Sequence, residues 1–146
     1  MAYDVVFVVT DGLSARAVQS HAPPLLAQAL PDLAGAGWQI APLILVRLGR
    51  VAIGDAVARA LNSDSVVVLI GERPGLSAPD SMGVYLTWQP GPHTTDAQRN
   101  CISNVRPDGI GYADAAFTLV HLLNAMRTRR VSGVTLKDTT GRLLTD

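Results

Sequence analysis

Two polar segments carry the side chains that could do chemistry in this chain. The first, residues 71–77 (GERPGLS), follows an apolar run at 66–70 and contributes the carboxylate of Glu72. The second, residues 100–106 (NCISNVR), contains the only cysteine, Cys101. A short β-branched run is typical of a strand buried on both faces, and ligands of α/β proteins bind at the carboxyl ends of such strands. From the residues alone, Glu72 either organises its loop through a salt bridge or contacts a ligand.

The other reactive side chains show no catalytic or metal-binding pattern. Cys101 has no neighbouring base in the sequence, so a nucleophile is not indicated. Neither of the glycine-rich phosphate-binding patterns, G-x-G-x-x-G or G-x-x-x-x-G-K-[ST], occurs in residues 71–77. The histidines have no metal-ligand spacing and are interpreted as surface or helix residues: His21, His93 and His121. We therefore expect no metal site and no catalytic residue on this chain.

Size and composition predict one domain that meets another protein. A chain of 146 residues can bury about two thirds of its unfolded surface around one core. Its net charge is zero, and the basic cluster at 127–130 is interpreted as helix-dipole compensation, so neither nucleic acid nor a membrane is an expected partner. Only 16% of the residues are charged against 48% hydrophobic, which leaves few charges for the exterior. With one cysteine and no signal-peptide pattern, we expect a cytoplasmic protein.

The hydrophobic pattern alternates strands with helices. Strands are predicted at 5–9, 40–46, 66–70, 83–88 and 131–136. Helices are predicted after the turn at 10–14 and, beyond a break at Pro23 and Pro24, at 24–33, 53–61 and 112–130, with a helical turn in 93–100 and an irregular region up to 111. The direction of 83–88 stays open, because the loop before it is near the lower limit for a parallel crossover.

This alternation predicts an α/β fold, a Rossmann-like open, mostly parallel sheet with helices on both faces. We expect a single α/β domain at 4–138 and a polar C-terminal tail at 139–146 that frays.

Four segments together resemble one enzyme family. They are 10–14 (TDGLS), 50–55 (RVAIGD), 66–77 and 100–106, and they resemble the small (light) subunit of ethanolamine ammonia-lyase over about residues 5–138. Cobalamin contacts in that family occur at positions matching Val51, Glu72 and Cys101, so the resemblance implies that these three residues bind the cofactor and that 4–138 is a cobalamin-binding domain. Neighbours in the same loops are given a supporting role: Arg50, Arg73, Ser77, Asn104 and Arg106.

The resemblance also implies a shared active site. A large, barrel-folded subunit would bind ethanolamine, and this chain would close over adenosylcobalamin from the other side in a heterooligomer. The implied reaction is radical deamination of ethanolamine to acetaldehyde and ammonia, started by homolysis of the cobalt–carbon bond, with the hard chemistry carried by the cofactor. The string Asp-x-His-x-x-Gly, which places a histidine on cobalt in other proteins, does not occur here, so the cofactor is expected to keep its own dimethylbenzimidazole.

Family members usually carry a further N-terminal segment, so we expect a truncated or naturally shortened form. The family's association with bacterial microcompartments adds encapsulation as an alternative to free cytoplasm. Two other functional classes stay open. A free-standing flavodoxin-like nucleotide or flavin binder would share the same alternation and would bind a mononucleotide tightly by itself. A structural interaction module would use the apolar surface without touching any cofactor.

Overall fold

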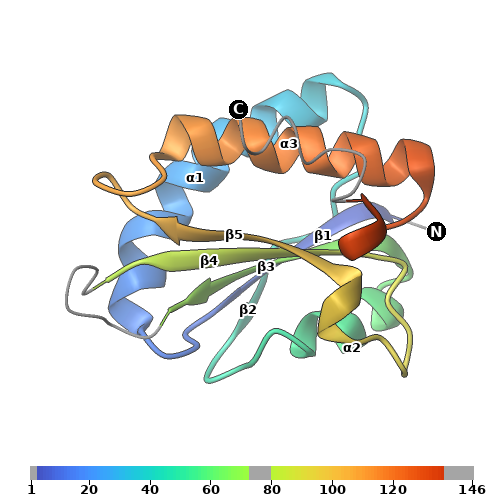
Figure 1. Cartoon of the computed structure of the whole chain (residues 1–146), viewed down its shortest axis with the longest axis horizontal. Coiled ribbons are helices and arrows are strands. Elements are labelled where there is room, and N and C mark those ends of the chain that lie inside the picture. Colours follow the sequence, from blue (N-terminus) through green and yellow to red (C-terminus); the bar gives the residue numbers. More distant parts are fainter. Residues whose placement is uncertain (1–2, 73–79, 137–146) are drawn as a thin grey trace.

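A five-stranded sheet forms the centre of the computed structural model, which describes residues 3–72 and 80–136 (Figure 1). Its strand order is β2-β1-β3-β4-β5. Along the chain the elements are β1 (Tyr3–Thr10), α1 (Ala15–Gly35), β2 (Ile44–Val46), α2 (Ile53–Ala60), β3 (Ser63–Gly71), β4 (Met82–Trp88), the 3-10 helix η1 (Asp96–Gln98), β5 (Arg99–Val105) and α3 (Tyr112–Arg129). The predicted tail at 139–146 lies outside the described residues.

The sheet is mixed, which corrects the predicted mostly parallel arrangement. β2 and β3 both pair in parallel with β1, where Val8 lies opposite Ile44 on one side and Val68 on the other. β4 then runs antiparallel to β3, and β5 runs antiparallel to β4. A parallel crossover needs about a dozen residues or more, and the connection at 72–81 is too short to provide one. The Rossmann-like description therefore fails for the last two strands.

Helices lie on both faces of the sheet, as predicted. α1 and α3 cover one face and α2 covers the other (Figure 1). Alternate residues of β1 consequently enter two separate cores: Phe7 packs in the core that contains Leu119 of α3, whereas Val6 and Val8 pack in the core that contains Ala58 of α2. Burial on both faces explains why β1 and β3 read as continuous apolar runs.

α1 is one helix where the sequence predicts a break. Ser14 caps it by accepting a hydrogen bond from the backbone N–H of Ala17 at 3.2 Å, and the helix continues through Pro23 and Pro24. Its buried residues form a stripe on both sides of the proline pair: Ala17, Val18, His21, Ala22, Leu25, Leu26, Ala29 and Leu33. Packing of this stripe outweighs the hydrogen bonds that interior prolines remove.

The C-terminal half contains two further corrections. β5 occupies part of the region predicted to be irregular, and the predicted strand at 131–136 is not formed. The side-chain amide of Asn100, a residue that disfavours strands, bonds both backbone groups of Gly133: Nδ2 donates to the carbonyl at 3.2 Å, and Oδ1 accepts from the N–H at 2.7 Å. Because both backbone groups of Gly133 bond to this side chain and its φ is 86°, Gly133 does not pair with a neighbouring strand. Residues 134–136 are helical.

The predicted strand at 40–46 is shorter in the structure: β2 covers Ile44–Val46, and Ile40 forms only an isolated bridge with Val5, because Pro42 between them has no backbone N–H to donate. The other predicted elements are confirmed. α2 and α3 lie within one residue of the predicted 53–61 and 112–130, β4 matches 83–88, and η1 lies inside 93–100. None of the helices in the described parts of the chain combines the length and apolar character that crossing a membrane requires.

Candidate functional site

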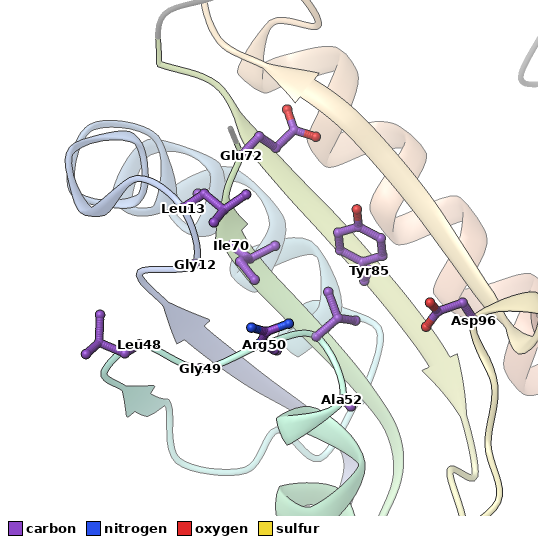
Figure 2. Close-up of a pocket in the computed structure, with 12 residues that line it drawn as sticks. Gly12, Leu13, Leu48, Gly49, Arg50, Ala52, Ile70, Glu72, Tyr85 and Asp96 are labelled. Atoms are coloured by element: carbon purple, nitrogen blue, oxygen red, sulfur yellow. The ribbon is translucent and has the colours of Figure 1, made fainter. Parts of the chain in front are cut away.

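A cavity of about 850 Å³ lies at the carboxyl ends of β1, β2 and β3. Figure 2 shows Glu72, Tyr85 and Asp96 on one side of it and Leu48 and Arg50 on the other. Ligands of open α/β sheets bind at the carboxyl ends of the strands, at the point where the strand order reverses. That point lies at β1 here, because the next two strands in the sequence, β2 and β3, lie on opposite sides of it. The lining residues are Gly12, Leu13, Leu48, Gly49, Arg50, Val51, Ala52, Ile70, Gly71, Glu72, Tyr85 and Asp96.

Glycines allow the loop after β1 to lie directly against the end of β3. A Cβ on Gly71 would collide with the backbone carbonyl oxygens of Asp11 and Ser14. Gly12 has a φ of 59°, in the left-handed region that favours glycine. The N–H of Leu13 donates to the carbonyl of Gly71 at 2.9 Å. Backbone therefore builds much of this part of the cavity wall.

Glu72 is oriented by two donors, one just before β4 and one in β5. The Ser81 hydroxyl donates to Glu72 Oε1 at 2.6 Å, and the backbone N–H of Asn104 donates to the same oxygen at 3.0 Å. The second donor exists because β5 contains a bulge: residues 103 and 104 lie opposite the single residue Gly83, and Asn104 has a φ of 61°. Oε2 lies beside Gly83, where a Cβ would come within 3.0 Å. Glu72 thus connects the end of β3 to Ser81 and to the bulge of β5, and it also lines the cavity.

The connection between β2 and α2 forms the opposite wall. The N–H of Gly49 donates to the Thr10 hydroxyl oxygen at 2.8 Å, which attaches this connection to the end of β1. Arg50 and Val51 follow directly and line the cavity. The carbonyl of Val51 accepts a hydrogen bond from Gly54 at 3.1 Å, so the residue is held at the entry to α2. Val51 offers an apolar contact beside the exposed Arg50 guanidinium.

Cys101 is not one of the lining residues, but it lies directly opposite Tyr85 on β4, which lines the cavity. Burial, with smaller effects of Cys101 and the Glu72 charge, raises the pKa of Tyr85 to about 12. Desolvation of the sulfur by neighbouring groups also raises the pKa of the Cys101 thiol, although the residue as a whole is exposed; the Glu72 charge adds to this, whereas a hydrogen bond from Tyr85 works against it. A raised pKa leaves little thiolate at neutral pH, which does not suit a nucleophile.

A buried arginine connects α2 with the start of β5. Arg99 makes a bidentate pair with the Asp55 carboxylate at 2.6 and 2.9 Å and donates to the Thr87 hydroxyl at 3.2 Å. Its Nε donates to Asp96 at 3.0 Å, which places a cavity-lining carboxylate. The hydrogen bond to Asp55 is the main cause of the raised pKa of Arg99.

The histidines of α1 and α3 lie outside this cavity. His21 is buried, with its ring nitrogens 2.6 Å from the Tyr112 hydroxyl and 2.8 Å from the carbonyl oxygen of Asp80, and it ties α1 to the start of α3. Within residues 3–72 and 80–136, no three side chains of His, Cys, Asp or Glu come together in a group that could hold a metal ion.

Comparison with known proteins identifies the family. The family model described as ethanolamine ammonia-lyase light chain (EutC) matches residues 1–137. The chain belongs to this light-chain family. It is 55% identical over 135 residues to the ethanolamine ammonia-lyase small subunit of Azotobacter vinelandii and 53% identical over 135 residues to that of Ralstonia nicotianae. Each alignment covers 92% of this chain and 50% of the relative, so the chain spans about half the length of these curated relatives.

Membership of the light-chain family confirms the resemblance found in the sequence. The structure brings Val51 and Glu72 together in the lining of one cavity, whereas Cys101 is outside the lining and lies beside the lining residue Tyr85. Among the supporting residues, Arg50 lines the cavity, and Asn104 bonds Glu72 through its backbone. Arg106 Nε donates to the side-chain oxygen of Asn104 at 3.0 Å, whereas Arg73 and Ser77 lie outside the described residues.

Two lining side chains of this light chain were missed by the sequence reasoning, Tyr85 and Asp96. Tyr85 carries a detectable signal, because it alternates with the buried Val84 and Leu86 and so belongs to the other face of β4. Asp96 carries none, since its position depends on the ion pair with Arg99, which in turn depends on the distant Asp55.

Proposed function

We propose that this chain acts as the small subunit of an ethanolamine ammonia-lyase and holds adenosylcobalamin at an interface with the large catalytic subunit. The observation that carries the proposal is the cavity at the carboxyl ends of β1 to β3, which collects residues from three of the four segments that resemble the family, in a chain that matches the light-chain family model over residues 1–137. Relatives named as small subunits support the existence of a larger partner.

The residues present fit one edge of a large corrin cofactor. The cavity volume of about 850 Å³ falls in the range of small-molecule sites, roughly 300–1,000 Å³, which is enough for part of a cobalamin but leaves the remainder for a partner to cover. The carboxylate of Glu72 is a suitable acceptor for the amide groups at the corrin periphery. Backbone at Gly12 and Gly71 permits close approach of a rigid ring.

Each proposed contact has a distinct physical role. Glu72 accepts a hydrogen bond from the cofactor with Oε2, because its other oxygen is engaged by Ser81 and Asn104. Val51 packs against an apolar edge, and Cys101 contributes bulk from β5 instead of nucleophilic chemistry. We assign residues 4–138 as the cobalamin-binding domain on this basis.

When bound, adenosylcobalamin would supply the radical chemistry that starts deamination of ethanolamine to acetaldehyde and ammonia. The residues of this chain bind and orient the cofactor and exclude water from one side of it, and we assign substrate contacts to the large subunit. The proposed assembly is a heterooligomer located in the cytoplasm or in an ethanolamine-metabolising bacterial microcompartment.

The test is to co-express the chain with an ethanolamine ammonia-lyase large subunit and to measure adenosylcobalamin-dependent release of acetaldehyde. The purified large subunit and the purified chain, each assayed separately, are the controls. We expect activity and tight cofactor binding only from the complex, because each partner alone leaves one side of the cofactor in water. Submicromolar cobalamin affinity of the isolated chain in calorimetry would contradict the shared site. A complex that assembles but binds no cobalamin would contradict the proposed function.

A further inference from the structure

The ion pair between Asp55 and Arg99 joins α2 to the start of β5. α2, which carries Asp55, packs on β1 and β3, whereas Arg99 is the first residue of β5 at the far edge of the sheet. The pair is bidentate at 2.6 and 2.9 Å, and the two side chains are only 13% and 4% exposed. Two parallel N–H···O bonds fix orientation as well as distance.

Each partner of this ion pair lies close in the sequence to a proposed cofactor contact. Asp55 lies four residues after Val51, in the first turn of α2, which begins two residues after Val51. Arg99 lies two residues before Cys101, so both project from the same face of β5. Neither Asp55 nor Arg99 lines the cavity, and the burial of Arg99 keeps its guanidinium from reaching a ligand there.

We propose that Asp55 and Arg99 are positioning residues for the cofactor: their buried pair sets the separation between the wall that contains Val51 and the opposite wall, where Tyr85 lies next to Cys101. This inference rests on the proposed function. Arg99 also positions Asp96, because its Nε donates to the Asp96 carboxylate at 3.0 Å, and Asp96 itself lines the cavity. Thr87 completes the set as a nearly fully buried acceptor for the same guanidinium.

An effect of this ion pair on cofactor binding can be separated from its effect on the stability of the fold, because apolar residues can often replace a buried ion pair. An apolar pair of similar volume is frequently neutral or stabilising, whereas one charge left without its partner is costly. The double variant Asp55→Leu/Arg99→Met therefore removes both charges together and keeps the site packed. Arg99→Lys tests the geometry more gently, because it keeps the positive charge but cannot form the bidentate pair.

The experiment measures adenosylcobalamin affinity of the assembled complex, with the large subunit in excess, for wild type and both variants. We expect about five- to thirty-fold weaker cofactor binding in each variant, with an unchanged ethanolamine KM at saturating cofactor and an assembled complex that stays folded at the assay temperature. Arg127→Lys is the matched control. Arg127 lies on α3, away from the cavity, and pairs with Asp4 at 3.9 Å, so the adenosylcobalamin affinity of this variant should equal that of wild type.

The outcomes separate this inference from the proposed function. A wild-type complex that binds no adenosylcobalamin overturns both. If wild type binds and both variants bind within twofold of it, the positioning role is wrong while the proposed function stands. Equal weakening by Arg127→Lys would also overturn it, because the effect would then reflect general loss of stability.

Discussion

The two halves of the sheet differ in how completely they are covered. β1 and β3, in the parallel half, lie between α2 on one face and the helices α1 and α3 on the other. The antiparallel half, β4 and β5, packs on α1 and α3, but on the α2 face Cys101 is exposed and Tyr85 is only partly buried. The cavity lies where this coverage ends, between the loops of the covered half and the face of the less covered half. The comparison separates residues that build the wall from residues left free to meet a partner or ligand.

The largest effect is expected from Gly71→Ala in the covered half. The new Cβ would meet the carbonyl oxygens of Asp11 and Ser14, which belong to backbone and cannot swing away. We expect a loss of about 3 kcal/mol in the free energy of unfolding, measured by chemical denaturation. Gly83→Ala is the control on β4, where the Cβ would instead meet side-chain atoms, Glu72 Oε2 at 3.0 Å and a Tyr85 ring carbon at 3.2 Å, and it should cost less than half as much. Equal costs would remove the contrast between the halves.

Glu72→Ala should have the next largest effect, on cofactor binding in the complex. Loss of a buried hydrogen-bond partner costs about 1–3 kcal/mol, which corresponds to an adenosylcobalamin affinity about five- to 150-fold weaker. Ethanolamine affinity at saturating cofactor should change little. Ser81→Ala, which removes one of the bonds that orient Glu72, should weaken the cofactor less. An unchanged cofactor constant with a large rise in the ethanolamine constant would place this loop at the substrate instead.

Tyr85→Phe tests the contact between Tyr85 and Cys101 in the less covered half, because it should change the pKa of Cys101. The Tyr85 hydrogen bond lowers that pKa, so its removal should raise the pKa further and slow alkylation of the only cysteine at a given pH above neutrality. Glu72→Gln should act in the opposite direction, because the charge it removes raises the pKa. The pH dependence of iodoacetamide labelling measures both. Shifts of the same sign in the two variants would contradict this arrangement.

Cys101→Ala should have the smallest effect. The residue is exposed and its thiol has a raised pKa, so we expect a stability change within about 0.5 kcal/mol and substantial turnover in the assembled enzyme. Activity and cofactor occupancy are measured together. Abolished turnover with full occupancy would require a chemical role for the thiol.

The same contrast explains which parts of the fold the sequence could predict. β1 and β3 were predicted because they are short continuous apolar runs, and α3 because its buried residues repeat with the helix period. β5 was not, because Asn100 faces inward to bond Gly133, a contact 33 residues away in sequence that no local pattern encodes. The continuous α1 was missed because tertiary packing overrides the local effect of its prolines.

The candidate site divides in a similar way. The locations of Val51 and Glu72 at strand ends were accessible from the alternation of elements, and the family resemblance selected them among their neighbours. The bidentate pair of Asp55 and Arg99 was not accessible, since its partners are 44 residues apart and each is unremarkable in its own segment. The cofactor roles of Val51, Glu72 and the ion pair are predictions that the cofactor-affinity measurements test.

The bulge in β5 has a consequence for mutational tolerance. Glu72 is held in part by the main-chain N–H of Asn104, and every amino acid except proline supplies that donor. Replacement by glycine, which adopts a φ of 61° without strain, would keep the contact intact. Deleting a single residue at 103 or 104 would instead remove the bulge, and with it the second residue opposite Gly83 that directs this N–H toward Glu72. This part of the site is therefore more vulnerable to a change in chain length than to most changes in side-chain identity.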